Sequence, residues 1–148
     1  MKLEEEIKQK AFLSAHQKAT INLIFTNNWL QNQHQDFFKP FGITPQQFNI
    51  LRILKGQHPK KISSNEVKSR MLDRNSDVSR LLDRLLAKKL IIKNISTFDK
   101  RVTEVFISEN GISLLEEIQK QSKGLYGLLK LTEAEAQTLN QLLDRARG

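Results

Sequence analysis

The segment NSDVSRLLDRLLAKKLIIKNISTFDKRVTEVFIS, residues 75–108, decides the fold because its hydrophobic period changes midway. In its first half, apolar side chains recur at helical spacing and leave the opposite face polar; they are Val78, Leu81, Leu82, Leu85 and Leu86. We expect a helix over residues 75–88 that is capped at its start by Asp73 or Asn75.

The second half of this segment has the pattern of a β-hairpin. Residues 91–95 are rich in isoleucine and favour a strand, and residues 102–107 alternate so that every second side chain from Thr103 to Ile107 shares one face. The polar residues 96–101 between them favour a turn. The sequence therefore predicts two short strands joined by a charged loop.

Two helices are predicted upstream by the residues that begin them. Thr44-Pro45-Gln46-Gln47 has the form of a capping box with proline at the first helical position, and this helix should end near Gly56 or Pro59. The sequence SSNE at residues 63–66 repeats the box and begins a short helix that ends by about residue 70. Together with the helix at 75–88, these elements form a helix-turn-helix followed by a hairpin wing.

A long helix is expected before this core. Apolar residues keep helical spacing over residues 3–30, and a helix over residues 4–35 would be about 48 Å long. A compact domain of this size has a radius of gyration of only about 15 Å, so much of such a helix should lie against a second copy of the chain. The alternative is that the Asn/Gln-rich end at residues 27–35 frays or bends.

Helices are also expected after the hairpin. A long one should begin at Ser108 and end near residues 128–130, and Thr132 with Glu135 should cap a last one. The fold class is therefore mainly α with a small β-hairpin wing (α+β), in which N- and C-terminal helices flank a winged helix-turn-helix.

The positive charge of the chain is concentrated in the predicted helix-turn-helix and wing. The formal net charge is +8, and residues 60–101 carry 12 basic and 5 acidic side chains. A basic block on a folded domain is typical of polyanion binding, although a solvated lysine-rich surface has the same composition. Because the block coincides with the helix-turn-helix, DNA binding is the favoured interpretation.

Composition argues against several other classes of protein. The chain has no cysteine, which excludes disulfides, thiolate metal sites and cysteine nucleophiles. No run approaches the roughly 20 apolar residues of a membrane span, and the charged start MKLEEEIKQK does not suit a signal peptide, so we expect a cytoplasmic protein. His16, His34 and His58 lack metal-ligand spacing and no catalytic motif occurs, so we expect no enzyme, metal or cofactor.

The polar face of the helix at 75–88 suits the major groove of DNA. Four side chains are expected at base edges: Ser76, Asp77, Ser79 and Arg80. Among them, Arg80 can bond guanine O6 and N7 together, and Asp77 can accept from cytosine or repel misaligned phosphates. A second set is expected at phosphates or in water: Arg84, Lys88, Lys60 and Lys61.

The tip of the hairpin holds Lys100 and Arg101 beside Asp99. A narrow minor groove has a strongly negative potential that attracts an inserted arginine. Asp99 can stiffen the tip by accepting a bond from a neighbouring arginine or from backbone amides. Taken alone, the composition equally fits an ordinary polar turn.

These motifs resemble the MarR family of winged helix-turn-helix transcription regulators. The stretch NSDVSRLLDRLLAKKLI resembles the recognition helix of that family, and FDKRVTEVFIS resembles its wing, in which an Asp is followed two residues later by an Arg. TPQQF at residues 44–48 and Gly111 continue the pattern. The resemblance covers residues 43–118 well, whereas the flanking helices match in arrangement only. Lys89 departs from the pattern by replacing the glycine usual after the recognition helix, where glycine relieves left-handed strain.

The resemblance implies a homodimer that represses transcription by binding a pseudo-palindromic operator, with half-sites about 34 Å apart. The whole of residues 1–148 would be one MarR-like domain, with dimerisation helices at 1–36 and 109–148 and a DNA-binding lobe at 43–108. Arg101 would enter the minor groove, with Lys100 beside it and Asp99 as its positioner. Small aromatic acids are common effectors in the family, but no motif identifies their pocket here.

Two alternatives remain for a winged helix of this kind. One is a protein–protein interaction module that no longer binds DNA, and the other is a non-specific nucleic-acid binder without ligand sensing. The basic block and Arg101 argue against the first.

Overall fold

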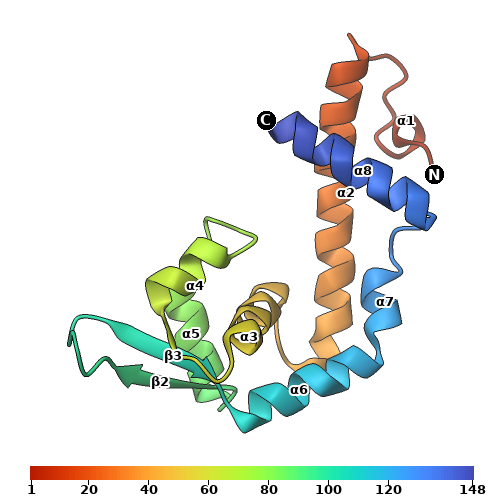
Figure 1. The fold of residues 1–148 in the computed structure, drawn as a ribbon. Coiled ribbons are helices and arrows are strands. Elements are labelled where there is room, and N and C mark those ends of the chain that lie inside the picture. Colours follow the sequence, from red (N-terminus) through yellow and green to blue (C-terminus); the bar gives the residue numbers. More distant parts are fainter.

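The computed structural model describes residues 1–148, which form a mainly helical protein with one small antiparallel sheet (Figure 1). In chain order, the elements are α1 (Leu3–Glu6), α2 (Ala15–Phe38), the 3₁₀ helix η1 (Lys39–Phe41), α3 (Pro45–Gln57), β1 (Ile62–Ser63), α4 (Ser64–Arg70), α5 (Val78–Ala87), β2 (Ile91–Ile95), β3 (Thr103–Ile107), α6 (Glu109–Lys120), α7 (Ser122–Tyr126) and α8 (Glu133–Arg147). The predicted fold class is confirmed. None of the helices combines the length and apolar character that a membrane span requires.

The hydrophobic core lies in the lobe that α3, α4, α5, α6 and the sheet form together. Each of these elements turns one apolar side inward, and the most deeply buried members are Ile50, Leu51, Leu54, Val67, Leu82, Leu85, Val105 and Ile107. Phe38, the last residue of α2, is buried in the same cluster. Burial of apolar surface therefore stabilises the lobe and fixes the lower end of α2 to it.

The sheet has the strand order β1-β3-β2 and is antiparallel throughout. β2 and β3 pair along their whole length, which confirms the predicted hairpin. The third strand, β1, was not predicted: Ile62 and Ser63 pair with β3 from a segment some 40 residues earlier in the chain. Because Ser63 is also the N-cap of α4, this pairing fixes the start of that helix against the wing.

The capping boxes confirm the predicted start of α3 but only half of the one predicted for α4. At α3, the Thr44 side chain accepts from the Gln47 N–H while the Gln47 side chain accepts from the Thr44 N–H. At α4, Ser63 accepts from the Glu66 N–H, but the Glu66 carboxylate turns away and pairs with Arg70 at 2.6 Å. In a full capping box the Glu66 carboxylate would accept from the Ser63 N–H. Here it pairs instead with Arg70, one helical turn further along the chain.

The helix predicted over residues 75–88 is shorter, because α5 begins at Val78 and its N-cap is Asp77. The caps predicted at Asp73 and Asn75 are therefore wrong. The Asp73 carboxylate accepts from the Asn75 N–H at 2.9 Å, and its carbonyl accepts from the Ser76 N–H. These bonds form a local turn. Short polar side chains can bond the nearby backbone in such a turn, which makes the turn an alternative to helix.

The long N-terminal helix predicted over residues 4–35 is also different. The chain forms the short α1, turns back through Lys8 at φ 54°, and starts again at α2 with Ser14 as the N-cap. At 24 residues, α2 is about 36 Å long. Its Asn/Gln-rich end neither frays nor stops, because the helix continues to the buried Phe38.

The single long helix predicted from Ser108 to residues 128–130 is two helices, α6 and α7, which break at Gln121. Gly124 and Gly127 lie just beyond the break, and glycine stabilises a helix less than any residue except proline. The last helix, α8, starts as predicted with a full capping box between Thr132 and Glu135.

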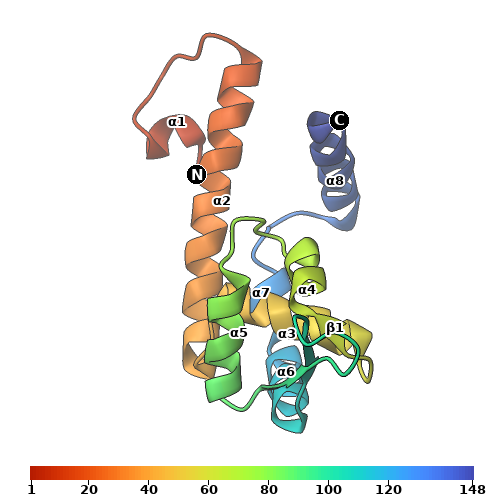
Figure 2. The ribbon, with the colours of Figure 1, turned by 90° about the vertical axis from the view of Figure 1, so that its left-hand side faces the viewer.

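The two outer helices, α2 and α8, extend away from the lobe and leave apolar side chains uncovered. Figures 1 and 2 show α2 standing on the lobe, with α8 near its far end but separated from it. No residue of α8 is buried, and Leu142 on that helix is 47% exposed. On α2, Ile24 is 58% exposed. An apolar stripe on a helix normally packs against another element, and here the chain supplies none.

Candidate nucleic-acid interface

The exposed face of α5 carries the side chains expected to read a nucleic acid. Its apolar residues turn into the core, while Ser79, Arg80 and Arg84 are exposed on the outer side. Neither arginine has an ion-pair partner within the chain, so both guanidinium groups keep their donors free. Asp83, the acidic residue on the same helix, is paired instead with Lys93 of β2 at 2.9 Å. The face is therefore positive and polar.

Ser76 and Asp77 were also expected at base edges, but the structure gives them other surroundings. Asp77 is exposed, but its carboxylate accepts from the Arg80 N–H at 3.2 Å as the N-cap of α5. The Ser76 hydroxyl is buried and has no hydrogen-bond partner. Ser76 therefore does not face outward with Ser79, and the capping role of Asp77 limits its freedom to contact a base.

The lysines predicted at phosphates divide into two groups. Lys60 and Lys61 are exposed beside β1, where the Lys61 ammonium lies 5.7 Å from the centre of the Phe106 ring. Lys88, at the C-terminal end of α5, donates instead to the Gly42 carbonyl at 2.5 Å. This bond joins the end of α5 to the link between α2 and α3, which makes Lys88 a structural tie within the chain.

The turn between β2 and β3 is held by side-chain bonds to its own backbone. The Asp99 carboxylate accepts from the Arg101 N–H at 2.9 Å, and the Asp99 carbonyl accepts from the Val102 N–H at 2.9 Å. Ser96, whose role was not predicted, is buried, and its hydroxyl accepts from Phe98 N–H at 3.3 Å and Asp99 N–H at 3.5 Å. Of the two roles foreseen for Asp99, the structure shows the backbone one. The side chains of Lys100 and Arg101 remain exposed and unpaired.

The connection from α5 to the wing strains the backbone at one residue. Lys89 has φ 60°, in the left-handed region that glycine adopts more easily. The Ser108 hydroxyl donates to the Lys89 carbonyl at 2.7 Å and also accepts from the Gly111 N–H. A single side chain therefore stabilises the end of α5 and caps α6.

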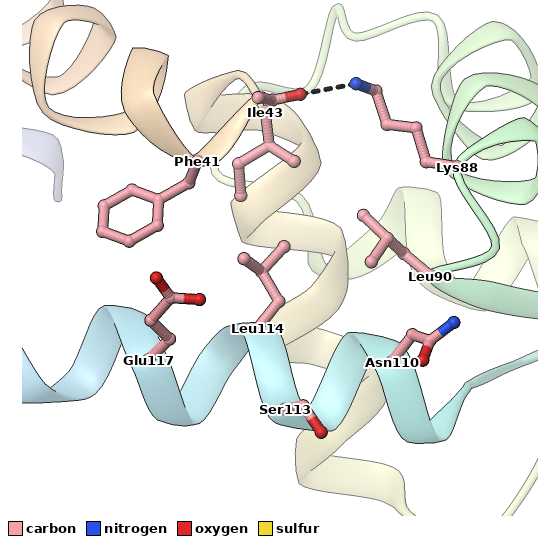
Figure 3. Close-up of a pocket in the computed structure, with 9 residues that line it drawn as sticks. Phe41, Ile43, Lys88, Leu90, Asn110, Ser113, Leu114 and Glu117 are labelled. Carbon is pink, nitrogen blue, oxygen red and sulfur yellow. Dashed lines mark hydrogen bonds between the residues drawn. The ribbon is translucent and has the colours of Figure 1, made fainter.

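A cavity of about 400 Å³ opens beside the Lys88 tie (Figure 3). Apolar side chains line its interior, namely Phe41, Ile43, Leu90 and Leu114. Lys88 and Glu117 lie at opposite sides of it, with polar groups of α6 between them. The cavity lies where the link from α2, the end of α5 and α6 meet, so a molecule bound there would touch all three segments.

The arrangement described above defines a winged helix-turn-helix protein: α4 and α5 form the helix-turn-helix and the β2–β3 hairpin is the wing. A family model of the MarR family matches residues 41–102, which include most of this lobe. The predicted resemblance of residues 43–118 to the MarR family is confirmed over the part that the family model matches, and the proteins below are similar to the chain in the same way.

Two characterised regulators of Bacillus subtilis (strain 168) are similar to the chain. The HTH-type transcriptional regulator MhqR is 33% identical over 79 residues, and the HTH-type transcriptional repressor MdtR is 34% identical over 96 residues. These alignments cover 52% and 64% of this chain, and they span only 52% and 61% of the two relatives.

Solved structures cover more of the chain. A MarR transcription factor from Planctomyces limnophilus has a TM-score of 0.71 at 26% identity, over 90% of this chain and 98% of that one. The MepR–DNA complex of Staphylococcus aureus has a TM-score of 0.76 at 21% identity, over 86% and 94%. The fold therefore extends beyond the lobe to the flanking helices.

Proposed function

We propose that this chain is a sequence-specific double-stranded DNA-binding regulator of transcription, a repressor that acts as a homodimer in the cytoplasm and has no catalytic activity. One observation carries the proposal: α5 and the wing tip of the same lobe both present exposed, unpaired arginines, at positions 80, 84 and 101. The similar protein MdtR is named a transcriptional repressor, and the similar MepR structure is a complex with DNA, which agrees with this assignment.

In this proposal, α5 enters the major groove of each half-site. Arg80 and Ser79 contact base edges, because both lie on the outer side of the first turn of α5. Arg84, Lys60 and Lys61 contact phosphates, which position the lobe without reading sequence. Asp77 caps the start of the helix, and Ser76, whose hydroxyl is buried, makes no base contact.

The wing supplies the minor-groove contact. Arg101 inserts its guanidinium group there with Lys100 beside it, because the negative potential of a narrow minor groove attracts both. Asp99 positions Arg101 by holding its backbone N–H.

The homodimer accounts for the uncovered apolar faces of α2 and α8. We assign residues 1–36 and 109–148 to dimerisation and residues 43–108 to DNA binding, with all 148 residues as one domain. However, Leu115 and Ile118 of α6 and Leu125 of α7 are buried against the lobe of their own protomer, so the interface falls mainly to α2 and α8. Sedimentation at micromolar concentration tests this assignment, and a monomer would contradict it.

The experiment that tests DNA binding is a selection from a random duplex library, followed by binding to the selected and a scrambled duplex. If a dimer makes six to ten phosphate contacts, its affinity should fall about 10³–10⁵-fold between 50 and 200 mM salt. A selected sequence with a steep salt dependence supports the proposal. Failure to enrich any sequence, together with a flat salt response, would favour a protein–protein interaction module. A steep response without sequence preference would favour a non-specific binder.

Ligand response is part of the proposal, and the cavity beside Lys88 is the place for it. A small aromatic acid fits because its ring would pack on Phe41 and Leu114 while its carboxylate drew the Lys88 ammonium from the Gly42 carbonyl. Releasing that tie would change how α5 sits relative to α2, and a ligand that prefers one arrangement shifts the population towards it. With benzoate as probe, the wild type should release the selected duplex, and the variant Lys88→Met should not respond.

A further inference from the structure

The wing tip carries one large apolar side chain that nothing in the chain covers. Phe98 is 97% exposed, and no other aromatic side chain is as exposed. Phenylalanine is normally at least partly buried, because leaving its ring in water forgoes about 1.5–3 kcal/mol. Neither the helix-turn-helix nor the proposed contact of Arg101 accounts for an aromatic ring at this position.

The backbone that carries the ring belongs to an ordered turn. The Phe98 N–H donates to the buried Ser96 hydroxyl, the Ser96 N–H donates to the Val102 carbonyl, and the Asp99 carboxylate holds the Arg101 N–H. The turn therefore presents Phe98 and Arg101 from one stiff frame, three residues apart. A backbone that is already ordered loses less conformational entropy when the side chains on it bind.

The surroundings of Phe98 favour a nucleic acid over a protein partner. Lys100 and Arg101 are exposed and unpaired beside it, while Asp99, the adjacent acidic group, bonds the backbone. In Figure 1 the turn between β2 and β3 projects from the lobe on the side away from α2 and α8. The exposed apolar residues of α2 and α8 lie on the helices assigned to the dimer, whereas Phe98 lies in the turn between β2 and β3.

We propose that Phe98 is a second DNA contact of the wing, in which its ring packs on the deoxyribose wall of the minor groove beside the step that Arg101 enters. This inference rests on the proposed DNA-binding function. The phosphodiester backbone offers apolar C–H surface on its sugars, and a cationic neighbour would hold the ring against it. Arg101 would then supply charge and Phe98 apolar contact within one groove.

The test compares the salt dependence of three variants on the duplex that the wild type selects from a random library. Phe98→Ala should weaken binding by about tenfold, near the lower end of what an aromatic contact with nucleic acid contributes. An apolar contact releases no counterion. The slope of log affinity against log salt for Phe98→Ala should therefore equal that of the wild type. Arg101→Gln should instead reduce the slope by about one per lobe. Leu72→Ala removes an apolar side chain that is 89% exposed between α4 and α5, outside the wing and the dimerisation helices and at none of the proposed DNA contacts, and it should change neither affinity nor slope.

A crosslink tests proximity independently of affinity. The chain with p-benzoylphenylalanine at position 98 should crosslink to the selected duplex, and the chain with it at position 13 should not. If Phe98→Ala binds as the wild type does, or position 98 gives no crosslink, this inference is overturned while the DNA-binding proposal stands. If the wild type itself selects no duplex, the DNA-binding proposal fails and this contact fails with it.

Discussion

The lobe and the flanking helices differ in how much of their structure the single chain can stabilise. In the lobe, every helix and strand contributes residues to one buried cluster. In the flanks, α2 buries only Phe38 and α8 buries nothing, although both carry apolar stripes. The lobe therefore has a complete hydrophobic core within one chain, whereas the outer helices leave apolar side chains uncovered. In the proposed function, the lobe reads DNA and the outer helices join two copies of the chain.

The largest expected effect on stability comes from replacing a leucine by alanine, and comparing a leucine of the lobe with one of the flanking helices tests the difference between them. Leu85→Ala in α5 removes a fully buried side chain and should lower the free energy of unfolding by about 2–5 kcal/mol. Leu142→Ala in α8 removes a half-exposed one, so it should leave the lobe nearly as stable but weaken self-association. Urea unfolding and sedimentation of both variants check this. Equal losses of stability would contradict the division between lobe and flanks.

A second pair of variants tests the junction between the lobe and α6. A Cβ added at Gly111 would lie 2.3 Å from the Leu90 carbonyl oxygen and 2.7 Å from Ile107 Cγ1. Gly111→Ala should therefore destabilise the protein by about 1–3 kcal/mol, the usual cost of overpacking. Gly56→Ala is the control, because its Cβ would meet nothing and alanine favours the helix by up to about 1 kcal/mol. Thermal unfolding should give melting temperatures that move in opposite directions, and a stabilised Gly111→Ala would count against the packing described.

Variants in the two regions should affect DNA binding in different ways: a variant in the lobe should lose sequence discrimination, and a variant in the flanking helices should lose affinity for every duplex. Arg80→Ala should reduce discrimination between the selected and the scrambled duplex by about 1–3 kcal/mol if its base contact is bidentate. Leu142→Ala should weaken binding to both duplexes alike, because it acts through the dimer. Titration of each variant with both duplexes checks this. An equal loss on both duplexes for Arg80→Ala would make Arg80 a phosphate contact.

The smallest effect concerns the start of α8. The N–H and hydroxyl of Thr132 donate to the Glu135 carboxylate and lower its pKa. A lowered pKa in the folded state means that this cap stabilises α8 at neutral pH and is lost as the pH falls through that lowered pKa, below the ordinary value of 4.5. Circular dichroism should show a slight loss of helix in that range for the wild type, and Glu135→Gln should abolish the dependence. If Glu135→Gln loses helix over the same pH range, the loss does not come from this cap.

Local signals explain how much of the fold could be predicted. The starts of α3 and α8 follow from capping boxes, whose bonds span only three residues. The hairpin follows from alternation, whereas the left-handed Lys89 was expected from the family resemblance, in which a glycine is usual at that position. Strand β1 could not be predicted, because two residues carry no pattern and its pairing depends on β3. The break between α1 and α2 has no proline or glycine to indicate it.

The sequence predicted which side chains of the candidate site are exposed, but it did not predict the contacts that these residues make within the chain. Charge and helical spacing located Arg80, Arg84 and Arg101 correctly on the surface. The Lys88 bond to Gly42 joins residues 46 positions apart, and no sequence pattern reports such a contact. Ser76 turned inward because the helix began later than its apolar spacing indicated, which moved that residue from the helix face into a turn.

The central claim is that two copies grip one duplex with α5 in the major groove and the wing in the minor groove. A crystal structure of the full chain with its selected duplex tests it most directly. The account predicts a two-fold dimer joined through α2 and α8, with Arg101 in the minor groove of each half-site and the two α5 helices about 34 Å apart. A wing that points away from the DNA, or two α5 helices that face opposite directions, would contradict it.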